Sequence, residues 1–184
     1  MQTRMNEKLK KAELRKKMRT ARDMMEVHKK RIADTQMCTE LLKTIYAKNA
    51  KVIHTYLPFG SEINIYPLIE ILLKNNYTVV CPKSLPKRAL ENLVLKSLGE
   101  LEEGRFGTKH PANSKEHKGD IDMFIVPGIA FDKSNYRLGY GSGYYDQFFA
   151  GEPKGYKVGI CYQFQIIEDF PLEPHDVKLD TIIY

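Results

Sequence analysis

Residues 121–126 read Ile121-Asp122-Met123-Phe124-Ile125-Val126, a short segment that is apolar at all but one position. A run of this length and composition is typical of a strand that is buried on both faces in the centre of a parallel sheet. Working outward from it, β-branched and aromatic residues predict five further strands. These strands are expected at residues 51–57, 77–81, 92–98, 156–162 and 181–184.

Helical segments alternate with these strands, since apolar residues recur at helical spacing among good helix formers. The alternation predicts one α/β domain over residues 1–184, a Rossmann-like three-layer α/β/α sandwich with a mostly parallel sheet. Residues 99–118 contain several glycines and a proline, and we expect them to form a loop. Helices are expected at residues 8–24, at 29–48 and from Pro67 to Leu73, and a short one is expected at 141–150.

Three loops with unusual side chains follow predicted strands, at residues 57–64, 127–146 and 162–180. In parallel α/β sheets, ligands collect at the carboxyl ends of the strands. We therefore expect the functional residues to lie in these loops.

The positive charge of the chain is concentrated at its N-terminus. Residues 1–31 contain 12 Lys or Arg against 4 Asp or Glu, whereas the remainder contains 17 against 19. A duplex-binding domain would spread basic residues over a docking face and offer a reading motif. A solvated helix face is the default for such a run, and binding of a polyanionic small ligand is the functional alternative.

The sequence also indicates a cytoplasmic protein. The N-terminus is basic without an apolar signal core, and no apolar run approaches the roughly 20 residues that span a bilayer. Cys38, Cys81 and Cys161 are far apart and lack CxxC spacing, so we expect reduced thiols and neither a disulfide framework nor a zinc site.

The segment from Arg137 to Asp146 carries Gly139, Gly141 and Gly143 in alternation. Glycines permit positive φ and close backbone approach, so successive N–H groups can form a nest for an anion. The expected helix that follows adds its N-terminal amides, and the arginine is suited to bidentate phosphate contacts. The spacing is neither the Walker nor the Rossmann pattern. A glycine-rich surface turn is the alternative, but the flanking Arg and Asp favour phosphate binding, the Asp as an Mg²⁺ ligand.

Residues 127–132 (Pro-Gly-Ile-Ala-Phe-Asp), followed by this glycine-rich segment, closely resemble the 5-formyltetrahydrofolate cyclo-ligase family. Three further segments match family motifs in the same order along the chain. They are Lys11-Ala12-Glu13-Leu14-Arg15, the loop from Leu57 to Glu62, and Pro174-His175-Asp176-Val177-Lys178-Leu179-Asp180.

The resemblance implies an Mg²⁺-dependent reaction in which ATP drives cyclisation of 5-formyltetrahydrofolate to 5,10-methenyltetrahydrofolate, and a fold like that of NagB, RpiA and the CoA transferases. It implies Arg137 and Tyr144 as catalytic residues, and Asp146 and Asp176 as Mg²⁺ ligands. The implied folate contacts are Leu57, Glu62, Tyr140, Gly141, Ser142, Gly143 and Tyr144, and the implied ATP contacts are Lys11, Arg15, Arg137, Leu138, Gly139, Tyr140, Gly141, Ser142, Gly143, Tyr144 and Tyr145.

Several residues near these motifs are interpreted as structural. We expect His54 to be a satisfied structural histidine, and Lys16, Lys17 and Arg19 to be solvated. Residues 104–111 match the family only in part, and no binding role is assigned to them.

Two other functions fit the sequence less well: another ATP-dependent small-molecule ligase or kinase, and a non-catalytic module that binds nucleotides or nucleic acid. The basic N-terminal helix is the support for the second. We expect a monomer or weak homodimer whose partners are the two substrates, with no nucleic acid and no membrane.

Overall fold

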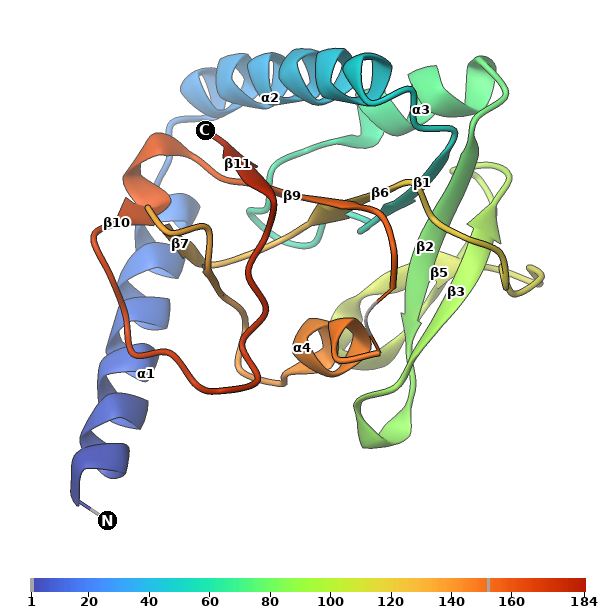
Figure 1. Ribbon diagram of the computed structural model, residues 1–184. Helices are drawn as coiled ribbons and strands as arrows, with labels where there is room; N and C mark the ends of the chain where they lie inside the picture. The colour runs from blue at the N-terminus through green and yellow to red at the C-terminus, as the bar shows by residue number, and fades with distance from the viewer. Residues whose placement is uncertain (1, 152) are drawn as a thin grey trace.

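A six-stranded sheet forms the centre of the protein (Figure 1). The computed structural model describes residues 2–151 and 153–184, and side chains from residue 5 onward. The strand order is β11-β9-β6-β1-β2-β3, in which all neighbours are parallel except β2 and β3. The strands are β1 (Val52–Thr55), β2 (Thr78–Ser84), β3 (Leu90–Leu95), β6 (Met123–Val126), β9 (Tyr156–Ile160) and β11 (Thr181–Ile183).

The segment at 121–126 is the central strand that its apolar composition predicted. Strand β6 lies between β1 and β9, and all four of its residues are buried. The other predicted strands occupy the remaining sheet positions, so the expected mixed α/β fold with a mostly parallel sheet is confirmed.

Different elements cover the two faces of the sheet. Helices α2 (Val27–Ala47) and α3 (Tyr66–Lys74) cover one face, where Leu41, Ile45 and Leu72 pack with apolar residues of β1, β2 and β6. The opposite face carries α4 (Tyr144–Phe149), whose Phe149 packs with Phe124 (Figure 1). A small sheet in the order β10-β7-β8 extends this second layer; its strands are β7 (Ala130–Asp132), β8 (Arg137–Leu138) and β10 (Ile166–Ile167).

Helix α1 (Gln2–Asp23) is polar along most of its length and packs on the small sheet through a narrow apolar stripe. Its Leu14 and Met18 contact a cluster that contains Ile129 and Leu138. The N-terminal part of the helix extends away from the central sheet (Figure 1). No helix in residues 2–151 and 153–184 is long and apolar enough to cross a bilayer.

Residues 99–118 are more ordered than the loop that we expected. Strands β4 (Leu101–Glu103) and β5 (Lys109–Pro111) form an antiparallel pair, joined by the single turn η2 (Arg105–Gly107). Phe106 and Gly107 have φ of 60° and 74°, and these left-handed conformations close the connection. A second short turn, η1 (Pro86–Arg88), joins β2 to β3.

The start of α4 also differs from the expected helix at 141–150. Gly141 and Gly143 have φ of 104° and 71°, so neither can belong to a right-handed helix, and the helix begins at Tyr144. The glycines therefore form the turn into the helix rather than its first residues.

Candidate functional site

A cavity of about 340 Å³ opens at the carboxyl ends of β1, β2 and β6. Leu57 follows β1, Ser84 ends β2 and Pro127 follows β6, and all three line the cavity. This is where the sheet topology was expected to place a ligand. Of the residues singled out from the sequence, those on the cavity wall are Leu57, Glu62, Arg137, Gly139, Tyr140, Ser142, Gly143, Tyr144, Tyr145 and Asp146.

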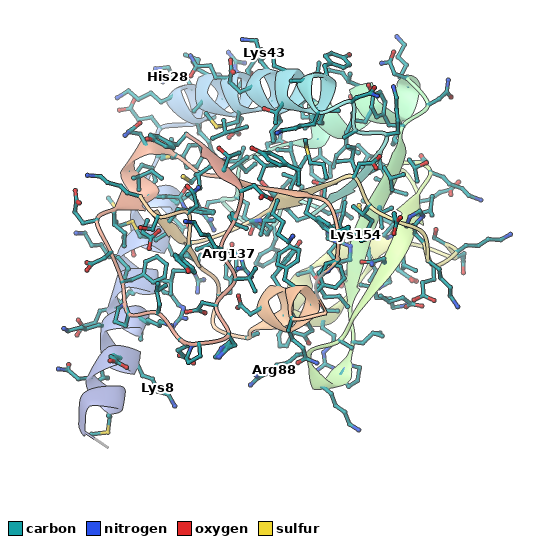
Figure 2. All side chains as sticks on the ribbon, in the orientation of Figure 1. Lys8, His28, Lys43, Arg88, Arg137 and Lys154 are labelled. Atoms are coloured by element: carbon teal, nitrogen blue, oxygen red, sulfur yellow. The ribbon has the colours of Figure 1, made fainter. Side chains whose placement is uncertain are left out.

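Arg137 lies deep in this site. Its side chain is 2 % exposed, and Nη1 donates a hydrogen bond to Oδ1 of Asp146 at 3.0 Å. The guanidinium group also lies over the rings of Tyr145 and Phe149, at 5.6 and 5.8 Å from their centroids. Figure 2 shows Arg137 among the interior side chains, whereas Lys8 and Lys43 project outward. The arrangement fixes the cation at the cavity wall, and a guanidinium group has more N–H donors than this one hydrogen bond uses.

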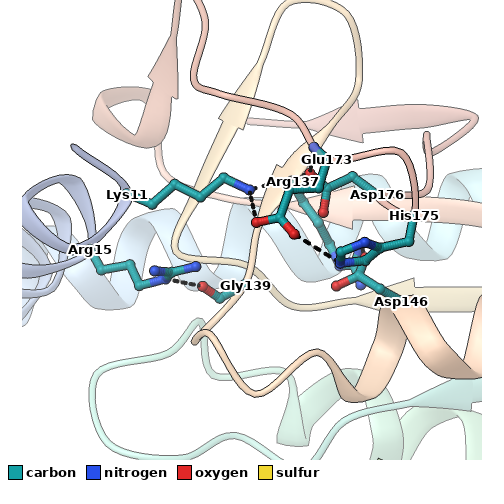
Figure 3. A network of polar contacts seen from close by, with 8 residues as sticks. All are labelled: Lys11, Arg15, Arg137, Gly139, Asp146, Glu173, His175 and Asp176. Carbon is teal, nitrogen blue, oxygen red and sulfur yellow. Dashed lines mark hydrogen bonds and ion pairs between the residues drawn. The ribbon is translucent and has the colours of Figure 1, made fainter. Parts of the chain in front are cut away.

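Arg15 of α1 contacts the glycine-rich segment. Its Nε donates to the carbonyl oxygen of Gly139 at 2.8 Å (Figure 3). A Cβ atom at Gly141 would lie 3.4 Å from Cζ of Arg15, so the guanidinium group packs against this glycine. Burial lowers the pKa of Arg15, and the carboxylates of Glu173 and Asp176 oppose that effect. Arg15 therefore brings a positive charge to the backbone that was predicted to hold phosphate.

Lys11 connects α1 to the C-terminal motif. Its Nζ lies 3.4 Å from Oδ2 of Asp176 and 3.4 Å from Oε1 of Glu173 (Figure 3). Oδ2 of Asp176 also accepts a hydrogen bond from the backbone N–H of Glu173 at 2.7 Å. Lys11 and Arg15 thus face the same side of α1, as their i, i+4 spacing predicted. Lys11, Arg15 and Asp176 lie outside the cavity wall, together with Leu138 and Gly141.

Glu62 is held in a defined orientation at the other end of the cavity. The hydroxyl of Tyr140 donates to Oε1 at 2.6 Å, and the backbone N–H of Phe59 donates to Oε2 at 2.9 Å. Burial raises the pKa of Glu62, while these two hydrogen bonds and the charge of Arg22 lower it. The carboxylate retains lone pairs that can accept hydrogen bonds from a ligand.

The two predicted Mg²⁺ ligands are both paired with cations, Asp146 with Arg137 and Asp176 with Lys11. Within the described ranges, no group of three or more His, Cys, Asp or Glu side chains is placed to hold a metal ion. Mg²⁺ is commonly bound through one or two carboxylates together with phosphate oxygens and water. The donor set therefore fits an ion that arrives with a nucleotide better than one that the protein alone holds.

The sequence did not reveal one wall of the cavity. This wall comes from the segment to which no binding role was assigned, and it consists of Phe106, Thr108 and Lys109. The ring of Phe106 meets that of Tyr144 edge to face, with 6.3 Å between the ring centroids. Arg19, which was expected to be solvated, is exposed but also reaches the cavity. An aromatic residue at the tip of a hairpin was the available signal, but its target is defined by packing.

The interpretation of His54 requires revision. His54 is fully buried, but neither ring nitrogen has a hydrogen-bond partner among the described residues, so it is not a satisfied histidine. The hydroxyl of Tyr144 donates to the carbonyl oxygen of Leu85 at 3.0 Å, and that of Tyr145 is buried without a partner among those same residues. Tyr144 and Tyr145 therefore contribute to packing as well as to the cavity wall.

The fold described above agrees with comparisons with known proteins. A model of the 5-formyltetrahydrofolate cyclo-ligase family matches residues 7–184. The 5-formyltetrahydrofolate cyclo-ligase of Haemophilus influenzae is 29% identical over 95% of this chain and 97% of its own length. The NMR structure of Aquifex aeolicus 5,10-methenyltetrahydrofolate synthetase superposes with a TM-score of 0.81 and 31% identity, over 94% of this chain and 88% of that one. The structure of a 5,10-methenyltetrahydrofolate synthetase from Mycoplasma pneumoniae superposes with a TM-score of 0.76 and 28% identity, over 94% of this chain and 97% of that one. The chain belongs to the 5-formyltetrahydrofolate cyclo-ligase family.

Proposed function

We propose that this cyclo-ligase family member converts 5-formyltetrahydrofolate and ATP to 5,10-methenyltetrahydrofolate, ADP and phosphate. The observation that carries the proposal is that residues of the glycine-rich segment and Glu62 line one and the same cavity. These are the two regions for which the resemblance implies nucleotide and folate contacts. The family match over residues 7–184 gives the reaction class.

The chemical difficulty of this reaction lies in the formyl oxygen, which is a poor leaving group. Transfer of the γ-phosphoryl group of ATP to that oxygen makes it a good one. N10 of the folate then attacks the formyl carbon and loses its proton to water, the carbon–oxygen bond breaks, and phosphate leaves. Such chemistry asks the protein mainly for positioning and charge neutralisation.

The nucleotide half of the site supplies cations and backbone donors. We assign Arg137 to the phosphates and to the charge that develops during phosphoryl transfer, because Asp146 holds one side of it and other donors remain. Lys11 and Arg15 approach the same region from α1, and residues 138–145 supply the backbone of the nest. Asp146 and Asp176 would hold Mg²⁺ together with phosphate oxygens, and the ion would neutralise negative charge on ATP.

The folate half of the site combines one carboxylate with apolar and aromatic surface. We assign Glu62 to the N–H groups of the pterin ring and Leu57 to apolar contact with it. Tyr140 and Tyr144 line the same cavity, and Tyr144 is the second residue that we assign to the reaction itself. The edge-to-face contact of Tyr144 with Phe106 extends the aromatic surface available to the folate.

We further infer a cytoplasmic enzyme whose partners are these two substrates, as a monomer or weak homodimer. The three cysteines are buried and free, which fits a reducing compartment. Lys11, Arg15 and Arg22 of α1 contact residues of the site. Part of the positive charge of this helix therefore has a use other than nucleic acid or a membrane surface.

The test is turnover of the purified protein with 5-formyltetrahydrofolate and Mg-ATP. The conjugated methenyl product should appear as an increase in absorbance, with ADP formed in equal amount. Omission of either substrate provides the control. An active folate preparation that gives no absorbance change would refute the proposal, whereas ATP consumption without methenyl product would indicate another ligase or kinase.

A further inference from the structure

Arg22, near the C-terminal end of α1, joins two loops of the site. Its Nε donates to Oγ of Ser61 at 3.0 Å, and its Nη2 donates to the hydroxyl of Tyr140 at 2.9 Å. Ser61 lies in the loop that carries Glu62, and Tyr140 lies in the glycine-rich segment. The residue is 6 % exposed, far less than a surface arginine of a polar helix. Neither its position in a basic run nor the matched motif identified it.

The chemistry of a guanidinium group fixes the direction of the hydrogen bonds that follow. Arginine can only donate, so the oxygen of Tyr140 accepts from it, and the phenolic proton is left for another acceptor. That acceptor is Oε1 of Glu62, at 2.6 Å. Arg22, Tyr140 and Glu62 therefore form a directed chain, in which Arg22 determines where the tyrosine hydroxyl points and how the carboxylate is turned.

The surroundings of Glu62 make Arg22 the charge that acts on this carboxylate. Burial raises the pKa of Glu62, and Arg22 is the charged group that opposes this shift. Lys30 of α2 faces the same residue, but its Nζ bonds the backbone oxygen of Glu62, at 2.9 Å, and is neutralised by Asp34. Burial and the charge of Glu62 also raise the pKa values of four phenols, on Tyr56, Tyr66, Tyr140 and Tyr145.

We propose that Arg22 is a positioning residue for folate, which acts through Tyr140 to orient Glu62 toward the pterin ring. The inference rests on the proposed function, since it assumes that Glu62 meets folate. Arg22 is placed to act on the folate half of the reaction and not on ATP, because its two partners lie in the Glu62 loop and at the Tyr140 hydroxyl.

A merely structural arginine gives a different result from a positioning one. Loss of a structural tie would lower thermal stability and disturb both substrates alike. Loss of the directed chain would raise the KM for folate, with the KM for ATP within about twofold of the parent value. The expected increase is about tenfold or more, the scale of one charge-assisted hydrogen bond.

The experiment compares Arg22→Gln, Arg22→Lys and Tyr140→Phe with the parent protein, after the parent has been shown to form the methenyl product. Lys17→Gln is the matched control, because Lys17 is an exposed basic residue on the same helix. Folate and ATP KM values, kcat and melting temperature are measured for each. We expect the tenfold increase in the KM for folate in Arg22→Gln and no increase in Lys17→Gln. Arg22→Lys should show a smaller increase, because lysine keeps the charge but lacks the planar pair of guanidinium donors.

The double variant Arg22→Gln/Tyr140→Phe tests whether the effect passes through the tyrosine. Its folate KM should equal that of Tyr140→Phe within about twofold, because the loss of the tyrosine hydroxyl already interrupts the hydrogen bonds from Arg22 to Glu62. Equal increases in both KM values, or additive effects in the double variant, would overturn the inference while the proposed function stands. If Arg22→Gln is too unstable to assay, Tyr140→Phe and Arg22→Lys decide the question, and an unchanged folate KM in both overturns the inference. A parent protein without turnover refutes the proposed function instead.

Discussion

Replacement of His54 by leucine should remove a large part of the acid sensitivity of this fold. The imidazole is fully buried in β1, where its ring lies 5.4 Å from that of Phe124 and 5.6 Å from that of Phe148. Burial lowers the pKa of His54 to about 3. The side chain of Asn92 opposes this shift, and its Oδ1 has no hydrogen-bond partner in the described part of the chain.

The sign and size of the effect follow from proton linkage. In the unfolded chain the imidazole has a pKa of about 6.5, so the unfolded state takes up a proton first as the pH falls. The native state takes up none until about pH 3, and the free energy of unfolding therefore decreases by about 1.4 kcal/mol per pH unit in this window. Between about pH 7.5 and about pH 5 the decrease from this one group is about 2 kcal/mol.

Urea unfolding of the parent protein and of His54→Leu, followed by circular dichroism at several pH values, measures this quantity. Contributions of all other groups cancel when the two free energies are subtracted at each pH. The free energy of unfolding of the parent should decrease by about 2 kcal/mol relative to that of the variant between about pH 7.5 and about pH 5. A difference that stays constant within about 0.5 kcal/mol would refute the reasoning, because it would mean that the native ring takes up a proton as readily as the unfolded one.

Three further tests, with five variants, address the nucleotide half of the site. Gly141 has a φ of 104°, so Gly141→Ala should destabilise the fold by about 1–3 kcal/mol in thermal unfolding and raise the KM for ATP. Gly139→Ala should destabilise the fold less, because φ is not positive there and an added Cβ atom would meet no atom within 4 Å. Equal destabilisation by the two variants would contradict the argument from backbone strain. Asp146→Asn and Asp176→Asn should each shift the Mg²⁺ titration of activity to about tenfold higher concentration, and an unshifted titration in both would remove them as ligands. Arg137→Ala should weaken ATP more than folate by calorimetric titration, and the reverse order would exclude its assignment to the phosphates.

Local chemistry explains what could be predicted from this sequence. The apolar run at 121–126 and the alternation of strands and helices predicted the sheet, because burial on both faces requires apolar residues in succession. The glycine-rich segment was recognisable for a similar reason, since backbone at the φ of 104° found at Gly141 strongly favours glycine. The i, i+4 spacing of Lys11 and Arg15 likewise predicted that both would face one side of their helix.

Pairing between distant residues explains what could not be predicted. Arg22 meets Tyr140 across 118 positions, and Tyr140 meets Glu62 across 78. The hairpin that carries Phe106 reaches the cavity only because the turn between β4 and β5 folds toward Tyr144. A basic residue on a polar helix looks the same in sequence whether it is solvated or buried against another loop.

The sequence by itself therefore determined the strands of the central sheet, the four helices and the family, because each depends on side-chain character or on spacing within one element. The tertiary structure alone decided that Arg22 is buried while Lys17 stays exposed, that His54 lacks a partner among the described residues, and that Arg137 is held by Asp146. These properties depend on which surfaces meet when the helices and loops pack on the sheet. Burial and partner choice then set the charge and orientation of each group.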